Sequence, residues 1–280
     1  MVSSFQMALR RCLYGLVLMA LTWGLFGCAT GPGSEEVDEW PPQITNLSQP
    51  EALEVFRADQ EKRRLLLGWW RVVGHMETSL KGEVQRHRME MVGGGGSFFR
   101  SRVFGPFKNI VMELTIIPEW LRLVNPGDRE VLEVAADSLG MEALTGMAFN
   151  PAWMLPAILG CTEGLRGDAL LDGATLTGET QTGESLWVNA ASGLVKRRRR
   201  VSADGRYFYV DYRWPKDPVP SGQRMKMPKQ VEMHLDDGSR LTMFLHEWFF
   251  FSKPPEVFPE QESASPFQVI YPEIGEGIHP

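Results

Sequence analysis

The distribution of hydrophobic positions divides the chain into four parts. Residues 13–26 form a continuous apolar run, and residues 29–42 have no apolar periodicity. From residue 48 to residue 252, most short segments alternate apolar and polar positions with the period of two that is typical of β-strands. Beyond that point the chain is rich in Pro and Glu. The pattern therefore predicts one folded domain over 48–252, followed by a largely irregular tail over 253–280.

The folded domain is expected to begin with a helix. Ser48 and Glu51 have the spacing of a capping box, in which the two residues satisfy free amides at the helix start. The helix should run to about Leu67, with Leu53 and Phe56 on its apolar face.

A series of strands is expected next, because large apolar residues recur at every second position. These strands cover residues 69–76, 84–91, 98–104, 110–117, 120–124 and 131–134. Gly93–Gly96 is expected to form a loose turn, and Asn125–Gly127 a tight one.

Two short apolar helices interrupt the strand pattern. The first would be capped by Asp137 or Ser138 and would carry Leu139, Leu144 and Met147. The second would start at Asn150-Pro151 and stop at Gly160. Pro156 lies inside this second helix and should kink or split it.

Strands return from about residue 176 to residue 248, with hairpin turns at 191–193, 203–205 and 236–238. An antiparallel meander interrupted by two apolar helices predicts a mainly β (α+β) fold. We expect a strongly curved antiparallel open β-barrel, whose concave apolar face is covered by a helical lid.

The N-terminal segment has the features of a bacterial lipoprotein signal peptide. Arg10 and Arg11 form a positive region, the apolar run is too short to span a bilayer, and Gly27 precedes Cys28. Leu25-Phe26-Gly27-Cys28 resembles a lipobox. We expect cleavage of residues 1–27 and acylation of Cys28, which leaves 28–47 as a flexible linker. An ordinary secretory signal that happens to end in Gly-Cys is the alternative.

The residue after the acylated cysteine and the net charge bear on location and partners. An acidic residue at that place retains many lipoproteins in the inner membrane, so Ala29 favours the outer membrane, with the domain facing the periplasm. Removal of residues 1–27 takes away two arginines and no acidic residue, which changes the formal net charge from −6 to −8. This charge gives no reason to expect binding of nucleic acid.

The sequence contains no convincing set of catalytic or metal-binding residues. After signal cleavage and acylation of Cys28, Cys161 is the one remaining thiol, so no intramolecular disulfide and no cysteine metal site can form. His246-Glu247 lacks the second histidine of a helical zinc site, and Gly93–Gly96 lacks the spacing of a phosphate-binding loop. We therefore expect no enzymatic activity and no cofactor.

Large, soft apolar side chains are in excess and have two interpretations. They form an ordinary core, or they line a cavity in which Met and aromatic side chains rearrange to admit acyl chains. The candidates for such a lipid-binding cavity are Trp70, Phe98, Phe104, Met112, Leu114, Leu144, Met147, Trp153, Leu155, Leu159, Met233 and Trp248.

Five consecutive cations, Lys196 to Arg200, lie in a predicted strand. One interpretation is an exposed strand near a sheet edge, protected by its charge. The other is contact with anionic lipid head groups or an acidic partner, for which Lys196, Arg198 and Arg200 are the candidates.

An ordered set of short motifs resembles the LolB family of outer-membrane lipoprotein receptors. The set comprises Gly105-Pro106-Phe107-Lys108, Leu144-Thr145-Gly146-Met147, Ile158-Leu159-Gly160, Asp204-Gly205, Tyr209-Val210-Asp211-Tyr212, Met227-Pro228, Val231-Glu232-Met233, Asp237-Gly238 and Trp248. It extends over about residues 65–250, nearly the whole domain. The Gly93–Gly96 run, the Lys196–Arg200 run and the tail after Ser252 depart from the family pattern.

The resemblance implies a function in lipid transfer. It implies an open barrel whose cavity takes the acyl chains of a lipoprotein delivered by a LolA-like periplasmic carrier, and helps to insert them into the outer membrane. Phe107 stands where the family has an exposed apolar residue that assists insertion, although a bulky Phe on this turn could equally be a covered core residue. The rival interpretation is a structural or sensing envelope lipoprotein of the same fold, which binds a protein or anionic lipid and carries no cargo.

Overall fold

The computed structural model describes the folded part of the chain. The described residues are 46–65, 68–80, 83–94, 98–137, 139–141, 151–201, 205, 207–217, 225–235, 238, 240–254 and 268–270. They all belong to one compact unit, Pro42–Tyr271. The predictions for the signal peptide, Cys28, Leu144 and Met147 lie outside the described residues, as do those for most of the linker and the C-terminal tail. Over the described ranges, no helix has the length and apolar character needed to cross a membrane.

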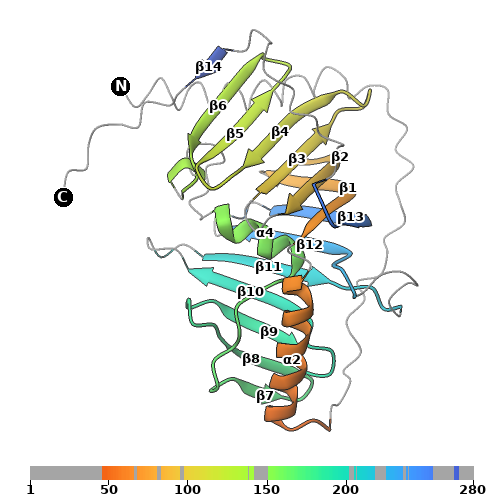
Figure 1. The fold of residues 1–280 in the computed structure, drawn as a ribbon, viewed down its shortest axis with the longest axis vertical. Coiled ribbons are helices and arrows are strands. Elements are labelled where there is room, and N and C mark those ends of the chain that lie inside the picture. The colour runs from red at the N-terminus through yellow and green to blue at the C-terminus, as the bar shows by residue number, and fades with distance from the viewer. Residues whose placement is uncertain are drawn as a thin grey trace, which may run out of the picture. The chain divides into compact units, whose positions relative to one another are not determined.

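The first half of the domain is an antiparallel meander, in which each strand pairs with the next (Figure 1). Its strands are β1 (Trp69–Leu80), β2 (Glu83–Gly94), β3 (Phe98–Phe104), β4 (Ile110–Ile116), β5 (Trp120–Asn125) and β6 (Glu130–Ala135). The strands predicted from period-two alternation are confirmed, with ends that differ by a few residues.

A second antiparallel meander completes the sheet. Its strands are β7 (Leu170–Asp172), β8 (Thr175–Glu179), β9 (Ser185–Asn189), β10 (Val195–Val201), β11 (Tyr207–Arg213), β12 (Gln230–Leu235) and β13 (Arg240–Phe251). The last strand returns to pair with β1 from Trp69↔Phe251 to Ser79↔Arg240, with a bulge at Val73/Gly74. This long-range pairing joins the two meanders into one sheet.

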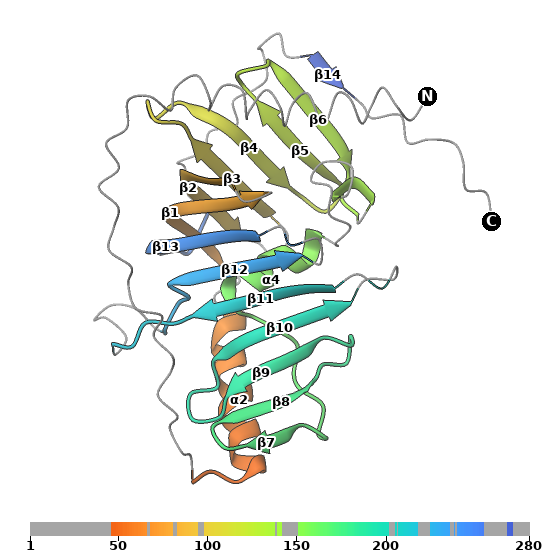
Figure 2. The same ribbon diagram turned by 180° about the vertical axis from the view of Figure 1, so that it is seen from behind.

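The sheet is open, because its two end strands, β14 (Gln268–Ile270) and β7, are not hydrogen-bonded to each other. The expected open antiparallel architecture is therefore confirmed. β14 runs parallel to β6 and adds Gln268–Ile270 to the edge of the sheet. Figures 1 and 2 show helices α2 (Gln49–Arg64) and α4 (Met154–Leu159) on the same side of the sheet, and α4 belongs to the expected lid.

Strand register defines the two faces of the sheet, since residues directly opposite each other project to the same side. Trp70, Gly93, Phe99 and Ile116 are aligned across β1 to β4. Leu155 of α4 also lies over Gly93, so we name this side the helix-side face.

The side chains between these positions point to the other side of the sheet, which we name the opposite face. It carries cross-strand ion pairs such as Arg71–Glu90, Arg102–Glu113 and Arg197–Asp211. These charged side chains identify it as the more polar side of the sheet.

Helix α2 (Gln49–Arg64) starts at the predicted capping box. The Ser48 N–H donates to Glu51 Oε2 at 2.7 Å, which satisfies one of the free amides at the helix start. Leu53 and Phe56 are buried, as expected from the apolar face. The helix ends at Arg64, earlier than the predicted Leu67, which lies outside the described residues.

Pro156 has the predicted effect on the second lid helix. The segment is split into a 3-10 turn, η2 (Pro151–Trp153), and helix α4 (Met154–Leu159). Pro156 thus falls in the first turn of α4, where a backbone N–H would have no partner within the helix. Gly160 ends the helix with φ +66°, a conformation that glycine adopts without strain. Of the first predicted lid helix, residues 139–141 are described, and they are helical.

Gly93 and Gly94 are strand residues of β2, so their assignment to a loose turn is wrong. A Cβ at position 93 would lie 2.5 Å from Cζ2 of Trp70 and 2.7 Å from Cδ1 of Leu155. A Cβ at position 94 would lie 2.5 Å from Cδ2 of Trp69. These glycines allow two tryptophan side chains to lie directly on the strand, which is the other common use of glycine in a sheet.

Candidate functional site

The helix-side face of β1 to β6 is strongly apolar. Its buried side chains are Trp70, Val72, Met89, Met91, Phe99, Val103, Leu114, Ile116, Leu121 and Val134. Met112 extends this surface and is half-buried. The two methionines of β2 supply flexible, polarisable side chains at its centre.

Most of the predicted cavity residues that are described lie on or against this face. Trp70, Leu114 and Met233 are buried in the sheet, and Met112 and Trp248 are half-buried. In the lid, η2 and α4 contribute the buried side chains of Trp153, Leu155 and Leu159. The structure therefore gathers these eight candidates on one side of the sheet, and their role in lipid binding stays a prediction.

Phe98 and Phe104 belong to the opposite face, so their assignment to the cavity is wrong. Phe98 is paired with Gly94 and Phe104 with Arg88. The Arg100 guanidinium lies 5.5 Å from the ring of Phe98, and that of Arg88 lies 5.8 Å from the ring of Phe104. Arginine stacking allows aromatic rings to occupy a solvated face.

The neighbouring side chains, Phe99 and Val103, are the ones that point to the helix side, and both are buried. Since apolar residues occupy adjacent positions at both ends of β3, the alternation did not fix which of them point inward.

A ladder of aromatic rings runs from this core to the surface. The ring centroids of Phe99 and Trp70 are 6.5 Å apart, and those of Trp70 and Trp248 are 5.5 Å apart. Trp248 stacks on Phe250 at 6.3 Å with planes 7° apart. Phe99 and Trp70 are buried, Trp248 is half-buried, and Phe250 is 37% exposed. The ladder is therefore a continuous row of aromatic contacts from the buried core to Phe250 at the surface.

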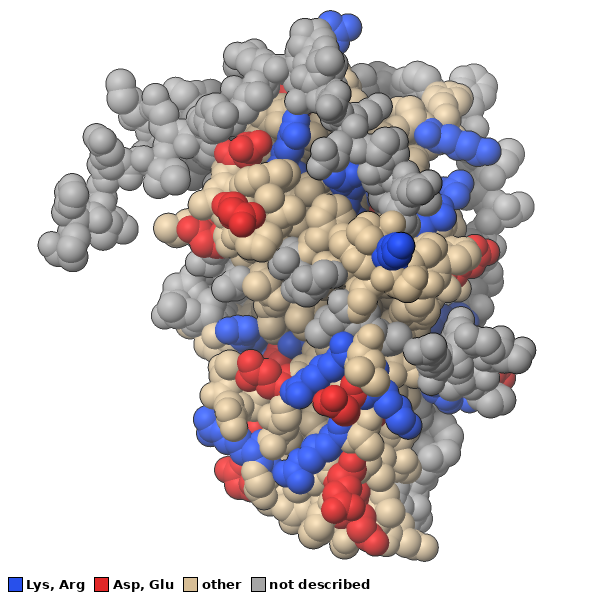
Figure 3. All heavy atoms as spheres, viewed as in Figure 1, with Lys and Arg blue, Asp and Glu red and all other residues tan. Residues whose placement is uncertain are grey.

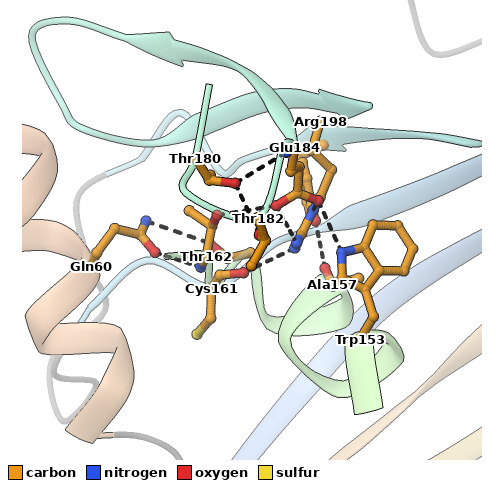
Figure 4. A network of polar contacts seen from close by, with 11 residues as sticks. Gln60, Trp153, Ala157, Cys161, Thr162, Thr180, Thr182, Glu184 and Arg198 are labelled. Carbon is orange, nitrogen blue, oxygen red and sulfur yellow. Dashed lines mark hydrogen bonds and ion pairs between the residues drawn. The ribbon is translucent and has the colours of Figure 1, made fainter. Parts of the chain in front are cut away.

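A buried polar cluster ties the lid to the sheet (Figure 4). Arg198 of β10 and Glu184, just before β9, form a bidentate ion pair with N–O distances of 2.5 and 2.7 Å. The Trp153 indole N–H donates to the same carboxylate at 2.9 Å, and Arg198 donates to the Cys161 carbonyl at 2.9 Å. The Thr162 hydroxyl donates to Glu184 at 3.2 Å. We name Arg198, Glu184, Trp153, Cys161 and Thr162 the lid latch.

The lid latch corrects the prediction for the basic run. Arg198 is 2% exposed, so it cannot contact lipid head groups. The interpretation as an exposed strand near a sheet edge is also wrong for Arg198, because β9, β8 and β7 separate β10 from the edge of the sheet. Burial of a charge is tolerated here because Glu184 neutralises it.

The other two candidates of the run are half-buried. The ammonium group of Lys196 donates to the Thr175 hydroxyl at 3.3 Å, and its partial burial lowers the pKa of Lys196. Arg200 projects to the helix side, opposite Phe208. Their contact with anionic groups stays a prediction. On the side of the molecule drawn in Figure 3, basic and acidic side chains are interspersed.

The C-terminal end of α4 is fixed by hydrogen bonds from α2 and the sheet. The Tyr212 hydroxyl donates to the Ala157 carbonyl at 2.6 Å, and burial raises the pKa of Tyr212 to about 12, so it remains a donor at neutral pH. Arg63 of α2 donates to the Leu159 carbonyl at 3.4 Å, and its guanidinium lies 4.4 Å from the Trp214 ring. Both ends of the η2–α4 lid are therefore held by polar contacts, whereas Leu155 between them makes apolar ones.

The Cys161 thiol is buried and free. Burial raises its pKa to about 11, so it stays protonated and is not an activated nucleophile at neutral pH. Across the part of the chain that the structure describes, no group of three or more His, Cys, Asp or Glu side chains is placed to hold a metal ion.

The β3–β4 hairpin presents Phe107 to solvent. Its side chain is 70% exposed, so the interpretation as a covered core residue is wrong. The turn is closed by Gly105 N–H donating to the Asn109 carbonyl at 2.9 Å, and by Lys108 N–H donating to the Gly105 carbonyl at 3.1 Å. Phe107 and the adjacent residue Lys108 thus lie at the tip of a turn that two backbone hydrogen bonds close.

Comparison with known proteins gives likenesses in fold alone. No family model matches the chain, and no curated protein matches its sequence. The fold is similar to a putative outer membrane lipoprotein-sorting protein domain from Vibrio parahaemolyticus, at 11% identity and a TM-score of 0.47, over 73% of this chain and 94% of that one. A LolA superfamily protein from Nitrosomonas europaea is similar at 14% identity and a TM-score of 0.47, over 75% and 97% of the two chains. A DUF1329 family protein from Desulfovibrio piger is similar at 12% identity and a TM-score of 0.46, over 72% and 92%.

Proposed function

We propose that this protein is an outer-membrane lipoprotein that binds the acyl chains of lipid-modified proteins or lipids and helps to insert them into the outer membrane. The observation that carries the proposal is the apolar helix-side face of β1 to β6, approached by the aromatic ladder and covered in part by α4. No covalent bond is made or broken in this function.

Transfer would be driven by burial of acyl chains. Each methylene moved from water into an apolar environment contributes about 0.8 kcal/mol, so a cargo chain remains bound until a better apolar environment is offered. The membrane is such an environment, and no nucleotide or cofactor is needed for the final step.

The β3–β4 hairpin suits a role at the membrane surface. Phe107 can enter the interface between head groups and acyl chains, and Lys108 can interact with anionic head groups. The proposed acylation of Cys28 would hold the domain within reach of the bilayer through the linker. A receptor anchored in this way would receive cargo from a soluble, LolA-like periplasmic carrier.

The first test is saturable binding of an acylated peptide. The chain from residue 28 onward, with Cys28→Ser to prevent its own acylation, would be titrated with a fluorescent diacyl lipopeptide and with the same peptide lacking acyl chains. We expect saturable binding of the acylated form alone. Equal signals from the two peptides, or no saturation, would count against the proposal.

A structural or sensing lipoprotein that carries no cargo is the second candidate. It is favoured by the burial of Trp70, Leu114, Trp153, Leu155 and Leu159, which already pack as a core in the absence of cargo. In that case the lipopeptide would not bind, and the domain would instead retain an envelope protein or anionic lipid.

A further inference from the structure

Among the residues that the structure describes, the indole N–H of Trp70 is a buried donor without an acceptor. The Trp70 side chain is fully buried, and its Nε1 finds no hydrogen-bond partner among the residues that the structure describes. Buried polar groups in native proteins are nearly always paired, so each exception requires an explanation. Trp248, the next ring of the aromatic ladder, differs in this respect, because its N–H donates to the Pro228 carbonyl at 3.3 Å.

The neighbours of the Trp70 indole are apolar side chains. A Cβ at Gly93 would lie 2.5 Å from Cζ2 and 2.7 Å from Cε2 of the indole, so the glycine allows the indole to lie directly on the strand. Cε2 is bonded to Nε1, which places the N–H close to this contact. The aliphatic Leu155 side chain of α4 fills the same space from the other side. An aliphatic side chain of the lid thus lies over Gly93 next to the indole, and the aromatic ladder extends from this position to the surface.

On the basis of the proposed function, we infer that Trp70 is the polar recognition residue of the acyl site. Its N–H donates a hydrogen bond to the ester or amide carbonyl of a bound acyl group, whose chain displaces Leu155 over Gly93. The remaining apolar surface binds hydrocarbon without regard to its attachment, whereas this donor distinguishes an acyl group from a plain alkyl chain. Both lipid-modified proteins and glycerolipids carry such carbonyls.

The experiment compares carbonyl-containing ligands with ether analogues of the same chain length. The chain from residue 28 onward, with Cys28→Ser, is titrated with a diacyl lipopeptide and its dialkyl ether counterpart, and with diheptanoyl phosphatidylglycerol and its diether counterpart. Trp70→Phe keeps an aromatic ring and removes the N–H. We expect this substitution to weaken binding of the two esters about three- to tenfold, as for loss of one hydrogen bond. Binding of the two ethers should change less than binding of the esters, and by a similar factor for both ethers.

Trp248→Phe is the matched control, because its N–H already has a protein acceptor. It should affect each ester and its ether equally. In protein labelled with 15N at the indoles, the Trp70 N–H proton, assigned by its loss in Trp70→Phe, should move downfield on ester binding and not on ether binding.

The outcomes separate the inference from the proposed function. If esters and ethers bind and respond equally to Trp70→Phe, the inference is overturned and the proposed function stands. If no ligand of either kind binds, the proposed function fails and the inference falls with it. An ester effect confined to the lipopeptide pair identifies lipid-modified protein as the source of the carbonyl, and one confined to the phosphatidylglycerol pair identifies membrane lipid.

Discussion

At the scale of single residues, the lid latch combines two opposite charges in a buried site. Moving a carboxylate and a guanidinium out of water is costly, and the cost is offset when geometry is good and the remaining donors and acceptors are paired. Glu184 accepts two hydrogen bonds from Arg198, one from Trp153 and one from Thr162. Both oxygens of the carboxylate therefore accept hydrogen bonds, and these bonds couple the start of the lid to strands β9 and β10.

Removal of one latch partner should strongly destabilise the domain. Arg198→Met leaves the Glu184 carboxylate buried and unpaired, so the free energy of unfolding should fall by about 3–5 kcal/mol in urea denaturation. The double variant with Glu184→Leu should regain much of that loss, because no isolated charge then remains.

Arg197→Met is the control for the latch, since Arg197 forms a half-exposed ion pair with Asp211 on the opposite face. Its loss should cost less than about 1 kcal/mol. Equal, small losses for Arg197→Met and Arg198→Met would contradict the structural role given to the latch.

At the scale of elements, the β3–β4 hairpin illustrates how a turn positions an exposed apolar side chain. Phe107 is held away from the core by the hydrogen bonds between Gly105 and Asn109 and between Lys108 and Gly105. Because the exposed ring contributes little to burial, we expect substitutions at Phe107 to have little effect on stability.

Phe107→Glu should separate function from stability. The free energy of unfolding should change by no more than about 0.5 kcal/mol, as for most surface substitutions, whereas delivery of a fluorescent lipoprotein into liposomes should slow markedly. Delivery should slow because moving the charged Glu carboxylate into the bilayer interface costs free energy.

Leu170→Glu is a matched control at the other end of the domain, because Leu170 in β7 is 71% exposed and Phe107 is 70% exposed. It should leave delivery unchanged. Equal slowing by both substitutions would mean that general surface polarity, and not the hairpin tip, determines the rate.

Local elements could be predicted from the sequence because their signals are local. The capping box at Ser48, the split before Pro156 and the stop at Gly160 all follow from backbone hydrogen bonding within a few residues. Phe98 and Phe104 were assigned to the wrong face because adjacent apolar residues at both ends of β3 are compatible with either phase of alternation.

Long-range partners could not be predicted in this way. Glu184 lies in a polar turn, and nothing in the local sequence indicates that it pairs with Arg198. Both interpretations of the basic run, an exposed edge strand and a contact with anionic groups, therefore missed the buried ion pair. In the same way, nothing local to Gly93 indicates that Trp70 and Leu155 meet over it.

At the scale of the whole domain, the β1–β13 pairing produces one open sheet with chemically different faces. The opposite face carries cross-strand ion pairs and arginine-stacked rings. The helix-side face gathers apolar side chains from both meanders beneath a lid that is held at its two ends. This division of the sheet underlies the proposal that acyl chains bind on one side only.

The central claim is tested most directly by mapping where a bound acyl chain lies. A diacyl lipopeptide with a photoreactive diazirine in one chain would be irradiated with the protein, and the modified residues identified by mass spectrometry. The account predicts labels on the helix-side face and its lid, at residues such as Trp70, Met91, Leu114 and Leu155. Labels confined to the opposite face, around Phe98 and Phe104, or no saturable labelling at all, would contradict it.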